Sequence, residues 1–152
     1  MRKLPSGEKR MPSKKSAFLD SSVFFSAVNS PTGGSAKLFT LKKIKLVTSR
    51  VVLTETERNV RKKLERYHLE RFFMLVSKVD IIDQTPRALQ IKKAERFIVK
   101  KDAVILAEAK QADIQILVTL DQKHFLIPRV RDFLKTKKVL TPKMLISSLE
   151  EN

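Results

Sequence analysis

The sequence contains no cysteine, which excludes a disulfide framework, a zinc–thiolate site, an iron–sulfur cluster and a cysteine nucleophile. Only two histidines are present, so a histidine-rich metal site is excluded as well. Glycine and proline are scarce, with three and six residues in 152, and 42% of the residues are hydrophobic. This composition is typical of a folded chain and not of a disordered or collagen-like one. We therefore expect one domain with its own core.

Long apolar segments are also missing. No stretch approaches the ~18 consecutive apolar residues that a membrane-spanning helix needs, and the basic opening residues are not followed by an apolar segment typical of a secretion signal. We therefore expect no membrane association and a location in the cytoplasm or another reducing interior compartment.

Positive charge is abundant, because 32 lysines and arginines face 16 acidic residues, a formal net charge of +16. Lysine and arginine displace counterions from phosphates, so such a surface favours a nucleic acid partner. Alternatively, the charge serves only solubility. Residues 1–15 hold six of the basic side chains and show no apolar periodicity, which predicts a flexible basic arm ahead of a domain at 16–152.

Short apolar runs alternate with helical patterns from residue 16 onwards. Helical spacing of Val23, Phe24, Ala27 and Val28 predicts a helix, and Val51, Val52, Thr56, Val60 and Leu64 trace one face of a longer one. Strands are expected at 16–19, 44–49, 79–83, 114–120 and 137–141, and further helices at 35–43, 67–77, 86–99, 101–113 and from 142. Apolar strands alternating with helices indicate a parallel sheet with helices on both faces.

Four acidic residues are expected at one rim of this sheet. Asp20 and Asp121 follow central strands directly, while Glu55 and Asp102 lie near the starts of helices. Ligands of open parallel sheets bind beyond the carboxyl ends of the strands. Clustered carboxylates repel one another, and Mg²⁺, which prefers oxygen ligands, is the usual compensation and can activate water for phosphodiester cleavage. Each acid taken singly can instead be a helix cap or a dipole partner.

Four segments resemble the PIN domain family in order and spacing over about residues 16–150. They read FLDSSVFFSA, VVLTETERNV, KDAVILAEAKQADIQILVTLDQKHF and VLTPKML. The resemblance implies a three-layer α/β/α sandwich with a central, mainly parallel sheet of four to five strands and an acidic pocket for Mg²⁺ or Mn²⁺. It also implies endoribonuclease activity, since many members cleave RNA, as toxins of toxin–antitoxin pairs or in RNA processing.

Site residues follow from the same resemblance. The catalytic acids are Asp20, Glu55, Asp102 and Asp121, and all but Glu55 are expected to hold the metal. Some family members have a further acid just after the last one, but here those positions are Gln122, Lys123 and His124. A second metal is therefore expected to be weakly held or absent. Ser22 and Thr119 match small polar positions of the family, and we group them with Arg50, Arg58 and Lys62 as substrate-binding residues.

The substrate expected is single-stranded or loop RNA, because an unpaired strand can bend a phosphate into a recessed pocket. An antitoxin or an RNA-processing partner and a homodimer are expected from the family. Two other hypotheses compete with that of a ribonuclease. The chain is either a non-catalytic RNA-binding or scaffolding module, or a phosphoacceptor receiver domain. The receiver hypothesis is disfavoured, because a receiver domain needs two adjacent acids after its first strand and SAFLDSS has one.

Overall fold

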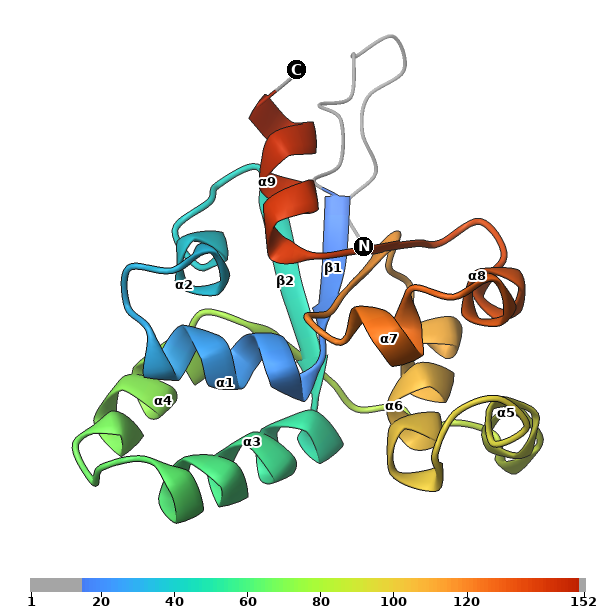
Figure 1. Cartoon of the computed structure of the whole chain (residues 1–152), viewed down its shortest axis with the longest axis horizontal. Helices are drawn as coiled ribbons and strands as arrows, with labels where there is room; N and C mark the ends of the chain where they lie inside the picture. The colour runs from blue at the N-terminus through green and yellow to red at the C-terminus, as the bar shows by residue number, and fades with distance from the viewer. Residues whose placement is uncertain (1–14, 151–152) are drawn as a thin grey trace, which may run out of the picture.

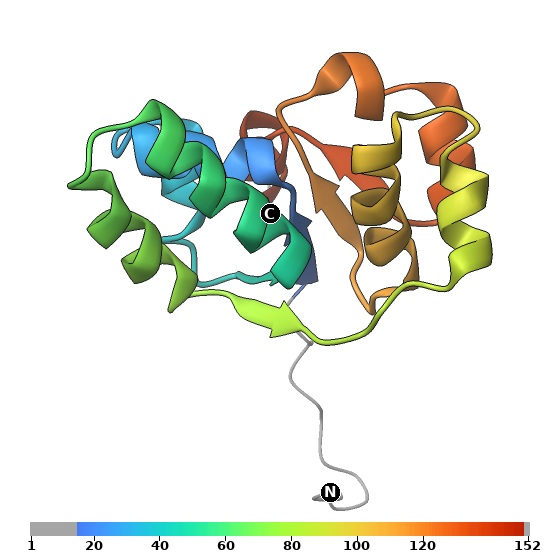
Figure 2. The ribbon, with the colours of Figure 1, turned by 90° about the horizontal axis from the view of Figure 1, so that it is seen from below.

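A central parallel sheet organises the chain, with helices on both faces (Figures 1 and 2). The computed structural model describes residues 15–150. Within that range the sheet has five strands in the order β3-β2-β1-β4-β5, and every neighbouring pair is parallel. The strands are β1 (Lys15–Leu19), β2 (Ile44–Ser49), β3 (Asp80–Ile82), β4 (Ile116–Val118) and β5 (Lys138–Leu140). The expected α/β/α sandwich is therefore confirmed.

Nine helices connect and cover these strands in the described residues. They are α1 (Ser21–Asn29), α2 (Gly34–Leu38), α3 (Arg50–Lys63), α4 (His68–Val76), α5 (Ala88–Ala94), α6 (Lys100–Gln111), α7 (Gln122–Phe125), α8 (Pro128–Leu134) and α9 (Pro142–Glu150). Within residues 15–150, no helix combines the length and apolar character needed to cross a membrane.

Two hydrophobic cores lie on opposite faces of the sheet. Successive side chains of a strand point to opposite faces, so Leu19 packs into a core with α1, α2, α4 and α9, whereas Phe18 packs into one with α5, α6 and α8. In Figure 1, α1, α2 and α4 lie on one side of β1 and β2, and α5, α6 and α8 lie on the other. Helix α3 contributes to both cores, because Val52 belongs to the second and Val60 to the first.

Helix α1 confirms the expectation from its apolar spacing. Val23, Phe24, Ala27 and Val28 are fully buried. The ring of Phe24 meets the ring of Phe39 edge-on, with 5.3 Å between centroids. This packing holds α1 in place, and α1 begins directly after the first of the four acids.

Some local expectations were wrong. Helices α7 and α8, with four and seven residues, were not predicted. The helix expected at 86–99 is shortened to α5, and Val51, expected on the buried face of α3, is 41% exposed. Residues 1–14 of the predicted arm lie outside the described residues, and Lys15, which we grouped with them, is the first residue of β1.

Candidate active site at the carboxyl end of the sheet

Asp20 lies directly after β1, where it caps the start of α1. Its Oδ1 accepts hydrogen bonds from the backbone N–H of Val23 at 3.2 Å and from the hydroxyl of Ser22 at 2.6 Å. An N-cap aspartate satisfies one of the free N–H groups of a helix start, so the capping role proposed for a single acid is correct here. The side chain is 4% exposed, which leaves its direction set by these partners.

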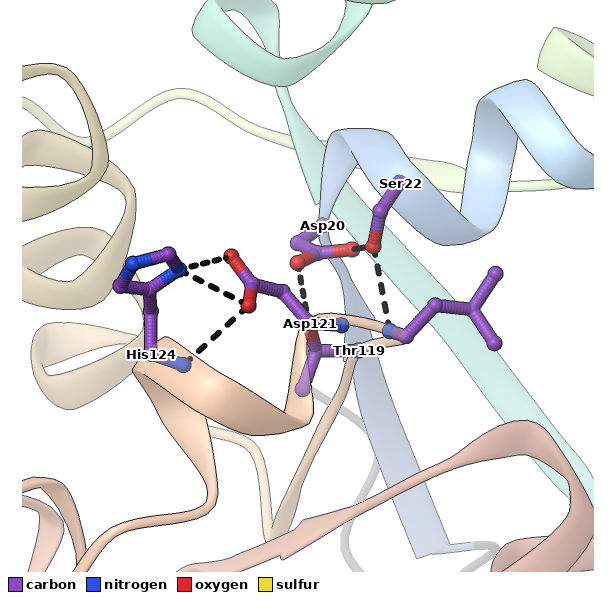
Figure 3. Close-up of polar contacts among 6 residues, drawn as sticks. Asp20, Ser22, Thr119, Asp121 and His124 are labelled. Atoms are coloured by element: carbon purple, nitrogen blue, oxygen red, sulfur yellow. Dashed lines mark hydrogen bonds and ion pairs between the residues drawn. The ribbon is translucent and has the colours of Figure 1, made fainter.

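Asp20 is also joined to the loop that follows β4 (Figure 3). The hydroxyl of Thr119 donates to Oδ2 of Asp20 at 2.5 Å and accepts from the backbone N–H of Asp121 at 3.0 Å. The backbone N–H of Leu120 donates to the Ser22 hydroxyl at 3.1 Å. Thr119 is fully buried, and its hydroxyl joins Asp20 to Asp121. Its expected part in substrate binding stays a prediction.

Burial raises the pKa of Asp20 to about 6. Hydrogen bonds from Ser22, Thr119 and Val23 oppose this rise, while the charge of Asp102 adds to it. A carboxylate so far from water is held by donors but has little to balance its negative charge.

Asp121 caps α7 and contacts a histidine. Its Oδ1 accepts from the backbone N–H of His124 at 3.1 Å, and Nδ1 of His124 lies 2.9 Å from its Oδ2. The His124 side chain is half-exposed. His124 therefore contacts Asp121 beyond the end of β4 (Figure 3).

Glu55 of α3 and Asp102 of α6 join Asp20 and Asp121 in one acidic cluster. All four acids line one cavity of about 300 Å³, which they share with residues including Ser22, Asn59, Lys63 and Lys101. Glu55 is nearly buried and pairs with the ammonium group of Lys101 at 2.9 Å. The rim predicted from strand ends and helix starts therefore exists, with all four acids on it.

The acids influence one another electrostatically. Burial raises the pKa of Asp102, and the charges of Glu55 and Asp121 raise it further. Lys101 and His124 act in the opposite direction. Side chains of the chain itself therefore offset part of the repulsion among the four carboxylates, which was not predicted from the sequence.

The donor set suits a hard divalent cation. Four carboxylates and the neighbouring Ser22 hydroxyl offer oxygen, which Mg²⁺ and Mn²⁺ prefer. In residues 15–150, however, no three acidic or histidine side chains are close enough together to form a ready metal cluster. Two of the carboxylates are engaged by Lys101 and His124, and Asp20 by hydroxyl groups. The chemistry fits a metal held by Asp20, Asp102 and Asp121, which would have to displace His124 from Asp121 and share the cavity with the Lys101–Glu55 pair.

Basic side chains flank the acidic cavity unevenly. Arg50 and Arg58 line an adjoining cavity of about 450 Å³ that shares Glu55 and Lys101 with the first. Lys62 lines neither cavity; Lys63, one residue and about 100° further round α3, faces the acids instead. Lys101 and Asn59 were missed, although Lys101 is the direct neighbour of Asp102 in the sequence and offered that signal.

Comparisons with known proteins agree with this architecture. A family model described as PIN domain matches residues 17–130. VapBC2 from Rickettsia felis, solved bound to a DNA fragment from its promoter, superposes with a TM-score of 0.65 at 20% identity over 83% of this chain and 98% of that one. PAE2754 from Pyrobaculum aerophilum gives a TM-score of 0.64 at 15% identity over 91% and 98% of the two chains.

A further solved structure carries a functional description. VapC20 from Mycobacterium tuberculosis, described as a Sarcin-Ricin loop cleaving toxin, gives a TM-score of 0.53 at 19% identity over 72% of this chain and 93% of that one. A search of curated proteins finds no match. At these identities the solved structures establish the fold.

Proposed function

The chain belongs to the PIN domain family, and we propose that it is a metal-dependent endoribonuclease that cuts phosphodiester bonds in single-stranded or loop RNA. The observation that supports this most directly is the convergence of Asp20, Glu55, Asp102 and Asp121 on one cavity. The net charge of +16 supports a polyanionic substrate.

The carboxylates have separate roles in this proposal. Asp20, Asp102 and Asp121 hold Mg²⁺ or Mn²⁺, directly or through water, and Glu55 orients the attacking water. When bound, such a cation activates water and stabilises the charge that develops on the phosphate. Ser22, Thr119 and the N–H of Val23 keep Asp20 in one orientation, so that it needs no rearrangement when substrate arrives.

Cationic side chains around the acids counter their repulsion of RNA. Arg50, Arg58 and Lys101 line the adjoining cavity, which gives the strand a route toward the acidic site. The Lys63 ammonium also borders the acids and stands 5.9 Å from the ring centroid of Phe25. These residues bind and place phosphates, while Ser22 lines the floor of the site. Arg50 must first leave Asp83, with which it pairs at 3.6 Å on the surface.

A toxin role is part of the proposal. One structural neighbour is described as a Sarcin-Ricin loop cleaving toxin and another is VapBC2 bound to a DNA fragment from its promoter. By analogy, this chain is inhibited by an antitoxin that covers its acidic site, and it forms a homodimer. A partner in RNA processing is the alternative within the same activity.

One observation favours the second candidate function, a non-catalytic RNA-binding or scaffolding module. The Lys101–Glu55 pair already balances part of the acidic charge without a metal, and the His124 ring occupies the carboxylate of Asp121. A cluster compensated in this way can persist in a protein that only binds RNA.

Cleavage of labelled single-stranded RNA with Mn²⁺, Mg²⁺ or EDTA tests the proposal. We expect metal-dependent cutting that falls by about 100-fold or more in Asp20→Asn. The matched control is Asp80→Asn, which makes the same chemical change at an exposed acid on β3 and should keep near wild-type activity. Equal cleavage by wild type and Asp20→Asn would contradict the site. Tight RNA binding by the wild type with no cutting would favour the scaffold.

Folding of the Asp20→Asn variant must be checked separately. Because burial raises the pKa of Asp20 to about 6, ionising it in the folded chain is unfavourable, and a neutral amide removes that penalty. We therefore expect the variant to melt no lower than the wild type in EDTA at pH 8. Thermal denaturation followed by circular dichroism measures this.

A further inference from the structure

A second, larger cavity lies among helices α5, α6 and α8, on the face of the sheet opposite to α1. These three helices stand together on one side of the sheet in Figure 2. The volume of the cavity is about 680 Å³, within the range of roughly 300–1,000 Å³ typical of small-molecule sites. None of the four acids lines it. It is therefore separate from the site described above.

The walls of this cavity are strongly basic. Its cations are Lys93, Arg96, Lys110, Arg129 and Lys135, and one acid, Asp132, accompanies them. Among residues 15–150, none of the five cations forms an ion pair. Burial lowers the pKa of Lys110, and the charges of Lys135 and Lys93 lower it further. Five crowded, unpaired cations are unfavourable by themselves and are relieved by an anion.

Two aromatic rings form an apolar surface among these charges. Phe97 and Phe133 meet edge-on with 5.5 Å between ring centroids, and both are half-buried. The ammonium group of Lys110 stands 5.3 Å from the centroid of Phe133. Aromatic rings bordered by cations are the recurring arrangement for stacking a nucleobase while binding its phosphate. A bare phosphate or a sulfate would not use the rings.

A polar group in the same cavity lacks a partner. Oε1 of Gln90 is buried and accepts no hydrogen bond from any described residue. Buried acceptors are nearly always satisfied in folded proteins. The exocyclic amine or ring N–H of a base is a donor of the kind this amide oxygen needs.

The backbone of Lys135 is strained at the edge of the cavity. Its φ is 62° and its ψ is −114°, a conformation that glycine adopts readily and lysine rarely does. Such strain destabilises the folded chain and is concentrated at functional positions. A lysine placed there adds one cation to the cavity at the expense of stability.

From these observations we propose that the cavity binds one nucleotide of a single-stranded RNA, with its base against Phe97 and Phe133 and its phosphates on the surrounding cations. The proposal rests on the ribonuclease function above for the identity of the ligand as RNA. Helix α6 connects the two sites: Asp102 in its first turn lines the acidic cavity, and Lys110 in its last turn lines this one. Eight residues separate them, about 12 Å along the helix axis. A strand anchored by one nucleotide here can therefore extend to the acids.

Binding of a labelled single-stranded RNA to the full chain in EDTA tests the anchor without cleavage. Lys93→Glu/Arg96→Glu should weaken binding by about tenfold or more and reduce its salt dependence. The matched control is Arg66→Glu/Lys78→Glu, which makes the same charge change at two exposed residues outside both cavities. Equal weakening by the two double variants would overturn the proposal, because only net charge would then matter.

The identity of the occupant is tested with small ligands. We expect adenosine monophosphate to shift the NMR signals of α5, α6 and α8 at concentrations where inorganic phosphate does not, and Phe133→Leu to weaken that binding. Equal binding of phosphate and the nucleotide would overturn the proposal in favour of a simple anion site. Tighter binding of an acidic peptide than of RNA would overturn it in favour of a protein partner.

Lys135→Gly separates binding from structural effects. The glycine relieves the positive φ, so the variant should melt at a higher temperature and yet bind RNA more weakly. Unchanged RNA binding would count against a role for Lys135 in the anchor. The RNA-binding measurements are made in EDTA, so they do not depend on cleavage. Loss of the predicted RNA binding at this cavity and loss of the predicted metal-dependent cleavage can therefore be told apart.

Discussion

The hydroxyl of Thr119 donates a 2.5 Å hydrogen bond to Oδ2 of Asp20, across 99 positions of the sequence. The strands preceding these residues explain the contact, because Leu19 of β1 pairs in register with Val118 of β4. Thr119 also accepts from the backbone N–H of Asp121. One buried hydroxyl therefore sets the relative positions of two proposed metal ligands.

Replacing Thr119 by valine should disturb the site without changing its shape. Thr119→Val leaves Oδ2 of Asp20 without a donor, raises the pKa of that carboxyl further, and should lower cleavage by about 10–100-fold. The pH profile of cleavage should move to higher pH. Thr119→Ser keeps the hydroxyl and serves as the control. Equal activity and equal pH profiles of the two variants would show that the hydroxyl does not position Asp20.

Lys101 is expected to compete with a bound cation. Its ammonium group lies 2.9 Å from Oε1 of Glu55 and also lowers the pKa of Asp102. Lys101→Met should tighten Mn²⁺ binding by about fivefold, because a unit charge at this range is worth about 1 kcal/mol in water. Isothermal titration calorimetry measures the change, with Lys100→Met on the exposed neighbouring residue as control. Unchanged or weaker Mn²⁺ binding in Lys101→Met would contradict this account.

Glu108 predicts a pH dependence of stability that is independent of any metal. It is buried in α6, and its Oε1 accepts from the hydroxyl of Ser49 at 2.7 Å. Burial raises the pKa of Glu108 above its ordinary value of 4.5. Between 4.5 and the raised pKa, the unfolded chain loses this proton while the folded chain keeps it. The free energy of unfolding therefore falls as the pH rises over that interval.

Glu108→Gln should remove this fall, because the amide oxygen still accepts from Ser49 but does not titrate. The difference in the free energy of unfolding between wild type and variant should therefore grow as the pH rises from 4.5 to the raised pKa, and stay constant above it. Urea denaturation from pH 4 to pH 8 measures it. Parallel curves for the two proteins would show that Glu108 is ionised in the folded chain.

The side chain of Lys137 caps the C-terminus of α6. Its ammonium group donates to the backbone carbonyls of Ala109, Lys110 and Ala112, which have no partners within the helix. Lys137→Met should lower the free energy of unfolding by about 1–3 kcal/mol. The exposed neighbour Lys138, replaced by methionine, should have almost no effect. A Lys137→Met protein as stable as the wild type would show that these three bonds contribute nothing net.

The predictions from sequence succeeded where the signal is local. The helix that begins after Ser49 was expected from its apolar spacing, and the Ser49 hydroxyl caps it by accepting from the N–H of Val52 at 3.2 Å. A cap and the helix it starts are neighbours in the chain, so their residues reveal them directly. That Lys63 and not Lys62 lines the acidic cavity could not be predicted, because a rotation of about 100° per residue decides which side chain faces the acids, and helix orientation depends on packing.

By itself, the sequence determined the alternation of strands and helices, the buried face of α1, and the placement of Asp20, Glu55, Asp102 and Asp121 at strand ends or helix starts. Apolar periodicity and caps act over a few residues, so the chain carries that information locally. The tertiary structure alone decided that Thr119 holds Asp20, that Lys101 pairs with Glu55, and that Phe97, Lys110 and Phe133 surround one basic cavity. Such contacts join segments far apart in the chain, and they depend on strand order and helix packing, which no short stretch of sequence records.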